Sequence, residues 1–181
     1  MSGQRDSQRA KLYRAENECW PVRTRIKNGE AVPEIPWEDV RAIVGGITTS
    51  DWWYQRLGYG KVPEAADRHS VYVGDGRGGT WARAGGYGIK LPRWARQLPV
   101  ILHELSHVLT GIRYRRVDHA AHGREFAKTF LEMVTRWMGP DEAARLRECF
   151  RKNHVHWVEK RKMSEEQRQK LREEFKRRMG R

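Results

Sequence analysis

Residues 98–109, LPVILHELSHVL, carry two patterns at once, and together they constrain the fold more than any other segment of the chain. The apolar residues recur with the spacing of an amphipathic helix: they are Leu98, Ile101, Leu102, Leu105, Val108 and Leu109. His103 and His107 are one helical turn apart, which places both on one face, roughly opposite the apolar stripe. The segment therefore predicts a helix that packs one face on the core and presents two histidines to a cleft.

The two histidines belong to the pattern HExxH, residues 103–107, which has a chemical meaning on a helix. Two histidines one turn apart can hold a single metal ion. Glu104 is offset from them by about 100° of helical rotation, so it lies beside the metal rather than on it. A carboxylate in that place can act as a base toward a water bound to the metal. The plain alternative is a pair of exposed histidines, and two further histidines downstream argue against it.

A catalytic zinc site needs a third protein ligand and an open fourth position. Four residues downstream have suitable side chains: Asp118, His119, His122 and Glu125. His122 directly precedes Gly123 and a second helical stripe, which is formed by Phe126, Phe130, Met133 and Trp137. A ligand at the start of a helix that packs on the core is held rigidly, so this position favours His122.

His119 lies in a polar connection, RYRRVDHAA, and we expect it to be a surface histidine or a neighbour of the metal site. A closed site of four histidines is the alternative, but it would leave Glu104 without a role. The sequence therefore favours an open site with three histidine ligands, which is the arrangement of a catalytic rather than a structural metal centre.

HELSH, followed after fourteen residues by HGREF at 122–126, resembles the signature of the SprT-like zinc metallopeptidases, in which HExxH precedes a His-Gly-x-x-Phe element. That family includes the Spartan-type proteases, which degrade proteins crosslinked to DNA. The sequence is also similar to short metallohydrolases of actinobacteria and their phages. The resemblance covers residues 80–130 and implies a zincin-like minimal metallopeptidase core. It implies one Zn²⁺ per chain, with His103, His107 and His122 as ligands and Glu104 as the catalytic acid and base.

The resemblance also implies that the strand before the metal helix borders the cleft and pairs with an extended substrate. The residues expected at this substrate edge are Gly86, Tyr87, Gly88 and Ile89. Besides zinc, the developing oxyanion needs a second electrophile, for which the loop after the helix offers Tyr114, Arg113, Arg115 and Arg116. His119, Tyr114 and Glu125 are thus expected beside the ligands or at the transition state. Many SprT-like proteins have a four-cysteine zinc ribbon after the core, and this sequence has none.

The middle of the chain, residues 68–91, contains short runs bounded by glycine with alternating apolar positions. These runs predict two or three strands of a small antiparallel sheet packed on the HExxH helix. Helical spacing returns after Pro92, with stripes through residues 95–112 and 123–138, and a third helix is expected after Pro140.

Additional helices are expected at both ends. Residues 4–19 have helical spacing, a short helix from Trp37 is expected to end at Gly45 and Gly46, and residues 48–60 begin with capping residues. The sequence as a whole predicts an α+β domain over residues 1–150, with its sheet at about 68–91 and its metal helices at about 94–138.

Charge separates the last segment from the rest. The chain of 181 residues has a formal net charge of +13, and residues 151–181 contain twelve Lys/Arg against five Glu. We expect this segment to be a basic helical or partly disordered extension that can contact DNA phosphates without sequence preference. Only Cys19 and Cys149 are present, which indicates a reducing compartment and no disulfide framework. No leader-like N-terminus and no apolar run of membrane-spanning length is found, so we expect a cytoplasmic protein without membrane contact.

The combined prediction is a zinc metallopeptidase that hydrolyses peptide bonds by Glu-assisted attack of zinc-bound water. Its expected partners are a protein or peptide substrate and DNA. HExxH dictates the activation of water but not the acyl group, so a hydrolase of a non-peptide amide is one alternative. A DNA-binding or regulatory protein with a structural or vestigial zinc site is the other.

Overall fold

The α+β character of the chain is confirmed in the computed structural model, which describes residues 6–21, 34–58, 63–64, 68–85, 88–114 and 120–157. In chain order the elements are α1 (Arg9–Cys19), α2 (Trp37–Thr48), α3 (Asp51–Leu57), β1 (Tyr72–Asp75), β2 (Arg83–Gly85), β3 (Gly88–Leu91), the 3-10 helix η2 (Arg93–Ala95), α4 (Leu98–Arg113), α5 (Arg124–Trp137) and α6 (Pro140–Lys152). The two metal helices and the helix after Pro140 are therefore confirmed.

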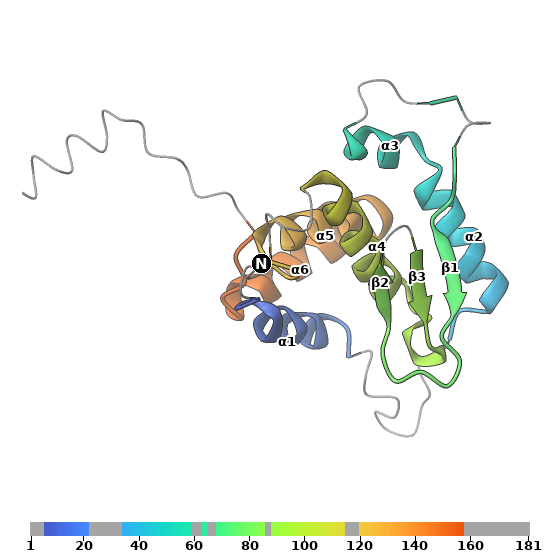
Figure 1. Ribbon diagram of the computed structural model, residues 1–181. Coiled ribbons are helices and arrows are strands. Elements are labelled where there is room, and N and C mark those ends of the chain that lie inside the picture. Colours follow the sequence, from blue (N-terminus) through green and yellow to red (C-terminus); the bar gives the residue numbers. More distant parts are fainter. Residues whose placement is uncertain are drawn as a thin grey trace, which may run out of the picture.

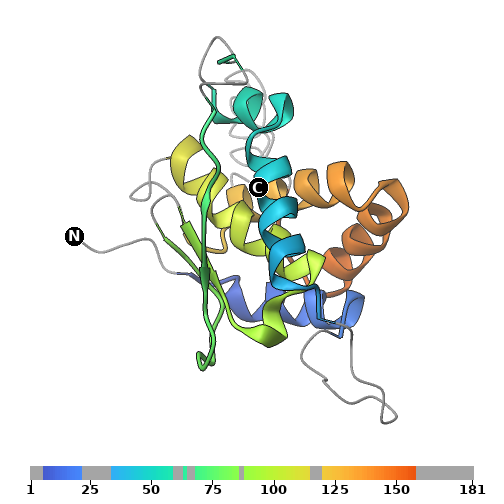
Figure 2. The same ribbon diagram turned by 90° about the vertical axis from the view of Figure 1, so that its right-hand side faces the viewer.

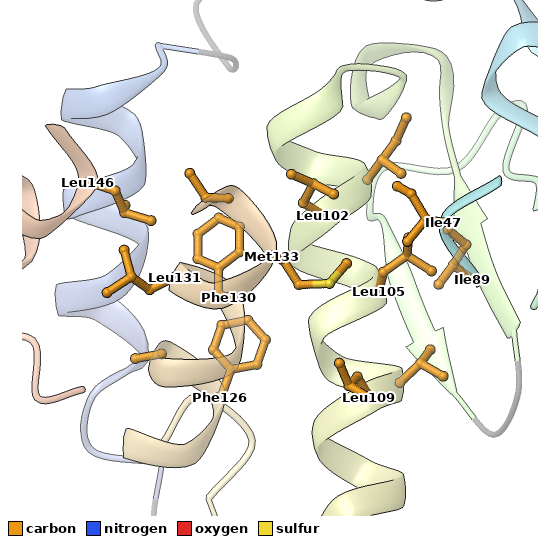
Figure 3. Packing of buried hydrophobic residues seen from close by; sticks show 14 of the residues in the cluster. Ile47, Ile89, Leu102, Leu105, Leu109, Phe126, Phe130, Leu131, Met133 and Leu146 are labelled. Atoms are coloured by element: carbon orange, nitrogen blue, oxygen red, sulfur yellow. The ribbon is translucent and has the colours of Figure 1, made fainter. Parts of the chain in front are cut away.

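The central element is α4, the helix that carries HExxH. It lies between the three-stranded sheet and a group formed by α1, α5 and α6 (Figure 1). In the view turned by 90°, α4 passes behind β1 and α2 (Figure 2). Its apolar stripe packs on the core as predicted, with Leu98 half-buried and the other members buried. Figure 3 shows Leu105 pointing toward Ile47 of α2 and Ile89 of β3. Phe126 and Phe130 of α5 pack on the other side of α4. The metal helix is thus fixed from both sides by the core.

The sheet corrects one prediction, because it is mixed rather than antiparallel. Its strand order is β1-β3-β2, with β2 and β3 antiparallel and β1 and β3 parallel. After β1 the chain crosses past the end of β3 and then forms β2 on the other side of it, so that β3 becomes the middle strand. Gly76 donates its N–H to the Leu91 carbonyl at 3.1 Å, and a Cβ at this position would lie 2.6 Å from the Pro92 nitrogen. Only glycine allows so close a crossing, and the strand spacing does not reveal it.

Two helix boundaries also differ from the sequence prediction. The helix that starts at Trp37 does not end at Gly45 and Gly46 but continues to Thr48. Ile47 is almost fully buried one turn beyond Val44, so packing outweighs the low helix propensity of glycine. The N-terminal helix begins at Arg9 rather than at residue 4, and residues 1–5 lie outside the described part.

The predicted domain boundary at residue 150 falls inside α6, and residues 153–157 continue to pack on the core. Val155 is buried, and the Trp157 ring lies 5.6 Å from that of Phe150. The remainder of the predicted basic extension, residues 158–181, lies outside the described residues. Among the described helices, none combines the length and apolar character needed to cross a membrane.

Candidate metal centre

The three predicted ligands converge. His103 and His107 extend from successive turns of α4, and His122 comes from the residues just before α5. Their ligand atoms all lie within 4.8 Å of one another, and Nε2 of His103 is 3.2 Å from Nε2 of His107. Nitrogens bound to one tetrahedral zinc at 2.0–2.1 Å would be separated by about 3.3 Å. The histidines can therefore hold a metal ion.

A carboxylate from α1 orients His103. Oε1 of Glu16 lies 2.6 Å from Nδ1 of His103, and the histidine is almost completely buried. An ionised carboxylate only accepts hydrogen bonds, so Nδ1 carries the proton in the neutral ring and Nε2 presents its lone pair to the other histidines. Metal-binding histidines generally have such a partner, which fixes the tautomer and makes the ligand nitrogen more basic.

His122 has the same arrangement with a different carboxylate. Oδ2 of Asp6 lies 2.7 Å from Nδ1 of His122, and the side chain of Gln8 donates to the His122 carbonyl at 3.1 Å. Burial lowers the pKa of His122, although the hydrogen bond to Asp6 opposes this shift, and a neutral ring is the form that binds metal. Nε2 of His122 is buried, and no hydrogen-bond partner reaches it within the described residues. A metal ion would satisfy this nitrogen, so the residues fit the group.

Phe126 and Gly123 account for the rest of the HGREF element. The Phe126 ring contacts all three imidazoles, with centroid distances of 4.9, 4.3 and 5.2 Å to His103, His107 and His122. Gly123 stands directly before α5, and a Cβ there would lie 3.1 Å from the Ala120 carbonyl oxygen and 3.2 Å from Oε2 of Glu125. Glycine and phenylalanine therefore let the chain turn tightly after His122 and close the apolar side of the site.

Glu104 lies next to the histidines in the wall of a cavity. The cavity is open to solvent at its mouth, and its empty space, counted together with the solvent in that mouth, is about 580 Å³. Its lining comes from α1, α4, α5, η2 and the residues before β2: Tyr13, Glu16, Asn17, Trp20, Trp81, Ala82, Trp94, Pro99, Val100, His103, Glu104 and Phe130. Burial raises the pKa of the Glu104 carboxyl, the nearby His103 lowers it and Glu16 raises it further. Such a carboxyl is suited to exchange protons with water and substrate.

Tyr13 of α1 adds a phenol to this cavity. Its ring stacks on His103 with centroids 5.6 Å apart at an interplanar angle of 17°, and its centroid is 5.1 Å from that of His122. Burial raises the pKa of Tyr13, while the nearby Arg9 lowers it. The hydroxyl therefore stays protonated near neutral pH and can donate a hydrogen bond to a ligand in the cavity.

The other predicted site residues lie elsewhere or cannot be placed. Arg113 contacts Glu132 at 3.5 Å and lies over the Tyr114 ring, and neither residue is part of the cavity wall that contains Glu104. Glu125 occupies the first turn of α5, with its carboxylate toward Gly123. Arg115, Arg116, Asp118 and His119 lie outside the described residues, as do Gly86 and Tyr87.

The predicted substrate edge requires a correction. Gly88 and Ile89 belong to β3, which is the middle strand of the sheet, paired with Tyr72 and Val73 on one side and with Ala84 and Gly85 on the other. Their backbone is therefore already used for pairing. Among the described strands, β2 is the edge on the side of the cavity, because Trp81 and Ala82 in the cavity wall lead directly into it.

Sequence reasoning missed Asp6, Tyr13 and Glu16, all of which come from α1 or the residues just before it. A weak signal was present: the helix has a stripe of Leu12, Ala15 and Cys19, all fully buried, and Glu16 follows Ala15 directly. An acidic residue beside an apolar stripe is usually solvated, however, so the pattern alone does not identify a partner for a metal ligand.

No protein-family model matches this sequence, and comparisons with curated proteins and with solved structures find no match either.

Proposed function

We propose that this chain is a zinc metallopeptidase of the SprT-like type, with a zincin-like catalytic core. The observation that supports this proposal most strongly is the combination of two features: three converging histidines, two of them backed by carboxylates, and a buried glutamate in the wall of an adjoining cavity. A purely structural metal site would need neither the cavity nor Glu104. Three nitrogen ligands with an open position fit catalytic zinc better than other common metals.

His103, His107 and His122 would hold the ion, and zinc bound there supplies a lowered pKa for water and polarisation of a carbonyl. Glu104 accepts the proton from the attacking water and passes it to the leaving amine. Its raised pKa, caused by burial, suits both halves of this transfer. The phenol of Tyr13 donates to the oxyanion that develops on the carbonyl. Tyr13 takes this role instead of Tyr114, because it shares the cavity with Glu104.

A peptide is the substrate that suits the surroundings of the site. Extended peptides commonly bind by adding a strand to the edge of a sheet. In this fold the strand would be added at β2, whose Arg83 and Gly85 are exposed. The aromatic walls of the neighbouring cavity, Trp20, Trp81 and Trp94, would then receive an apolar side chain of the bound peptide.

The proposal is tested by replacing Glu104 while measuring zinc and hydrolysis separately. We expect Glu104→Gln to retain about one zinc per chain and to lose casein and histone digestion by about 10²-fold or more. Glu148→Gln on α6 is a matched control, because Glu148 is exposed and its ion pair within the described part of the chain is with Arg151. Full activity of Glu104→Gln with zinc unchanged would disprove its role. Absence of peptide products from the zinc-loaded wild-type protein would favour the non-peptide amide hydrolase.

DNA is the second partner that we propose, and this proposal rests on charge. Residues 151–181 carry a net charge of +7, and most of them lie outside the described residues. Removal of residues 159–181 should weaken binding to single-stranded DNA and flatten its dependence on salt. An unchanged salt slope would refute a role of this segment in DNA binding. Digestion assays with and without DNA would show whether DNA activates hydrolysis.

A further inference from the structure

The only two cysteines of the chain, separated by 130 positions in sequence, meet at the contact between α1 and α6. Sγ of Cys19 lies 2.6 Å from Sγ of Cys149. A disulfide bond is about 2.04 Å long, so the two sulfurs are about half an ångström from bonding distance. Both cysteines are free thiols in this structure.

The contact is held in register by a polar pair on each side of the cysteines. Nε1 of Trp20, the residue after Cys19, donates to Oε2 of Glu142 at 2.7 Å. Nδ2 of Asn153, one turn after Cys149, donates to Oε2 of Glu18 at 3.1 Å. The two helices are thus held where the sulfurs lie side by side.

We propose that Cys19 and Cys149 form a reversible intramolecular disulfide that ties α1 to α6. The oxidant is a small-molecule disulfide of the glutathione class. Cys149 is partly exposed, whereas Cys19 is fully buried, so Cys149 is the residue that the oxidant reaches first. The Cys149 thiolate attacks the oxidant and displaces one glutathione. Cys19 then attacks Sγ of Cys149 and displaces the second glutathione, whose departing thiolate takes the proton of Cys19. Two protein thiols are thereby oxidised, and one glutathione disulfide is reduced to two thiols.

Burial and the hydrogen bond with Cys149 raise the pKa of the Cys19 thiol, which agrees with this order of steps. A thiol held neutral is a poor nucleophile toward a reagent in solution. The Cys19 thiol nevertheless reacts, because the mixed disulfide forms on Cys149, whose sulfur is in contact with that of Cys19.

The disulfide has a consequence for the metal centre, and this part rests on the proposed function. Glu16, the partner of His103, lies one helical turn before Cys19 on α1. A covalent tie at the end of α1 restricts movement of this helix away from α4, so it keeps the Glu16 carboxylate on His103. Oxidation should therefore slow the release of zinc, whereas the ligands themselves are unchanged.

The first test concerns the disulfide alone and does not depend on metal or activity. The full-length protein is incubated with glutathione disulfide, and thiols are titrated after denaturation. We expect the two thiols per chain to disappear, with a mass lower by two hydrogen atoms, a monomer on a non-reducing gel, and recovery of both thiols with dithiothreitol. Because the loop is long, the oxidised chain should also unfold at a higher denaturant concentration.

Cys149→Ser and Cys149→Ala are the matched controls, since a partly exposed position tolerates both and either variant removes the bridge while Cys19 stays in the core. A glutathione adduct that persists on wild-type Cys149, or a disulfide between chains, would overturn the proposal.

In the second test, a chelator competes for zinc. Oxidised protein should release zinc about tenfold more slowly than reduced protein. This factor is at the lower end of the change in metal affinity that follows when a metal ligand loses its carboxylate partner. Equal rates would refute the link to the metal centre but would leave the disulfide itself intact.

Discussion

The three histidines that can hold a metal ion and the carboxylates hydrogen-bonded to two of them come from two regions with different kinds of sequence signal. The ligands lie on α4 and at the start of α5, where spacing within a few turns determines which side chains share a face. The carboxylates Glu16 and Asp6 belong to the N-terminal region, 87 and 116 positions away from the histidines that they contact. Local periodicity therefore identifies the three histidines. The carboxylates that contact them are brought into place only when α1 packs on α6 and α6 packs on α5.

The largest effect is expected on the side of the ligands. His122→Ala should reduce bound zinc from about one per chain to a trace, because two histidines on one helix do not close a tetrahedral site. His119→Ala should retain zinc, because His103, His107 and His122, whose ligand atoms lie within 4.8 Å of one another, already supply the three ligands of an open site. Both are measured by metal analysis after dialysis against a weak chelator. The reverse pattern would make His119 the third ligand.

The same contrast explains how much of the fold could be predicted. The buried face of α4 and the residues of α5 that pack on it follow from helical spacing, and the structure has them where the stripes predict them. The strand order does not follow from spacing, because it depends on the close crossing of Gly76 past Leu91 and Pro92. Gly45 and Gly46 predict the end of a helix, but tertiary packing of Ile47 overrides that signal.

A similar limit applies to the site. The sequence identified Glu104 through its position in HExxH, which is a local pattern. The same local reading predicts a second electrophile in the loop after α4, because that loop is adjacent in sequence. The cavity instead contains Tyr13, which precedes Glu104 by 91 positions in the chain. Its ring nevertheless stacks on that of His103. A single sequence does not reveal contacts of this range.

The contribution of α1 to chemistry can be separated from its contribution to folding by removing one oxygen atom. We expect Tyr13→Phe to keep its zinc and its ring stacking but to lower kcat by about 10²-fold, the usual loss for one oxyanion donor. KM should change little, because the hydroxyl acts mainly in the transition state. Tyr72→Phe on β1 is the control, since Tyr72 is 68% exposed. If both variants were equally active, Tyr13 would have a structural role only.

The smallest effect is expected from the carboxylates of the N-terminal region, and it tests whether they tune the metal or merely pack. Glu16→Gln and Asp6→Asn preserve the size of each side chain and an oxygen that accepts from Nδ1, but they remove the negative charge. Each should weaken zinc affinity by about tenfold, measured by competition with a chromogenic chelator, because the histidine becomes a less basic ligand. Glu18→Gln on α1 provides the comparison. Glu18 contacts Lys152, the last residue of α6, and Asn153, which follows it, so its replacement should leave zinc affinity unchanged. A uniform loss in all three variants would mean that negative charge in this N-terminal region acts only through the stability of the fold. The distinction between the histidines and the carboxylates that orient them would then fail.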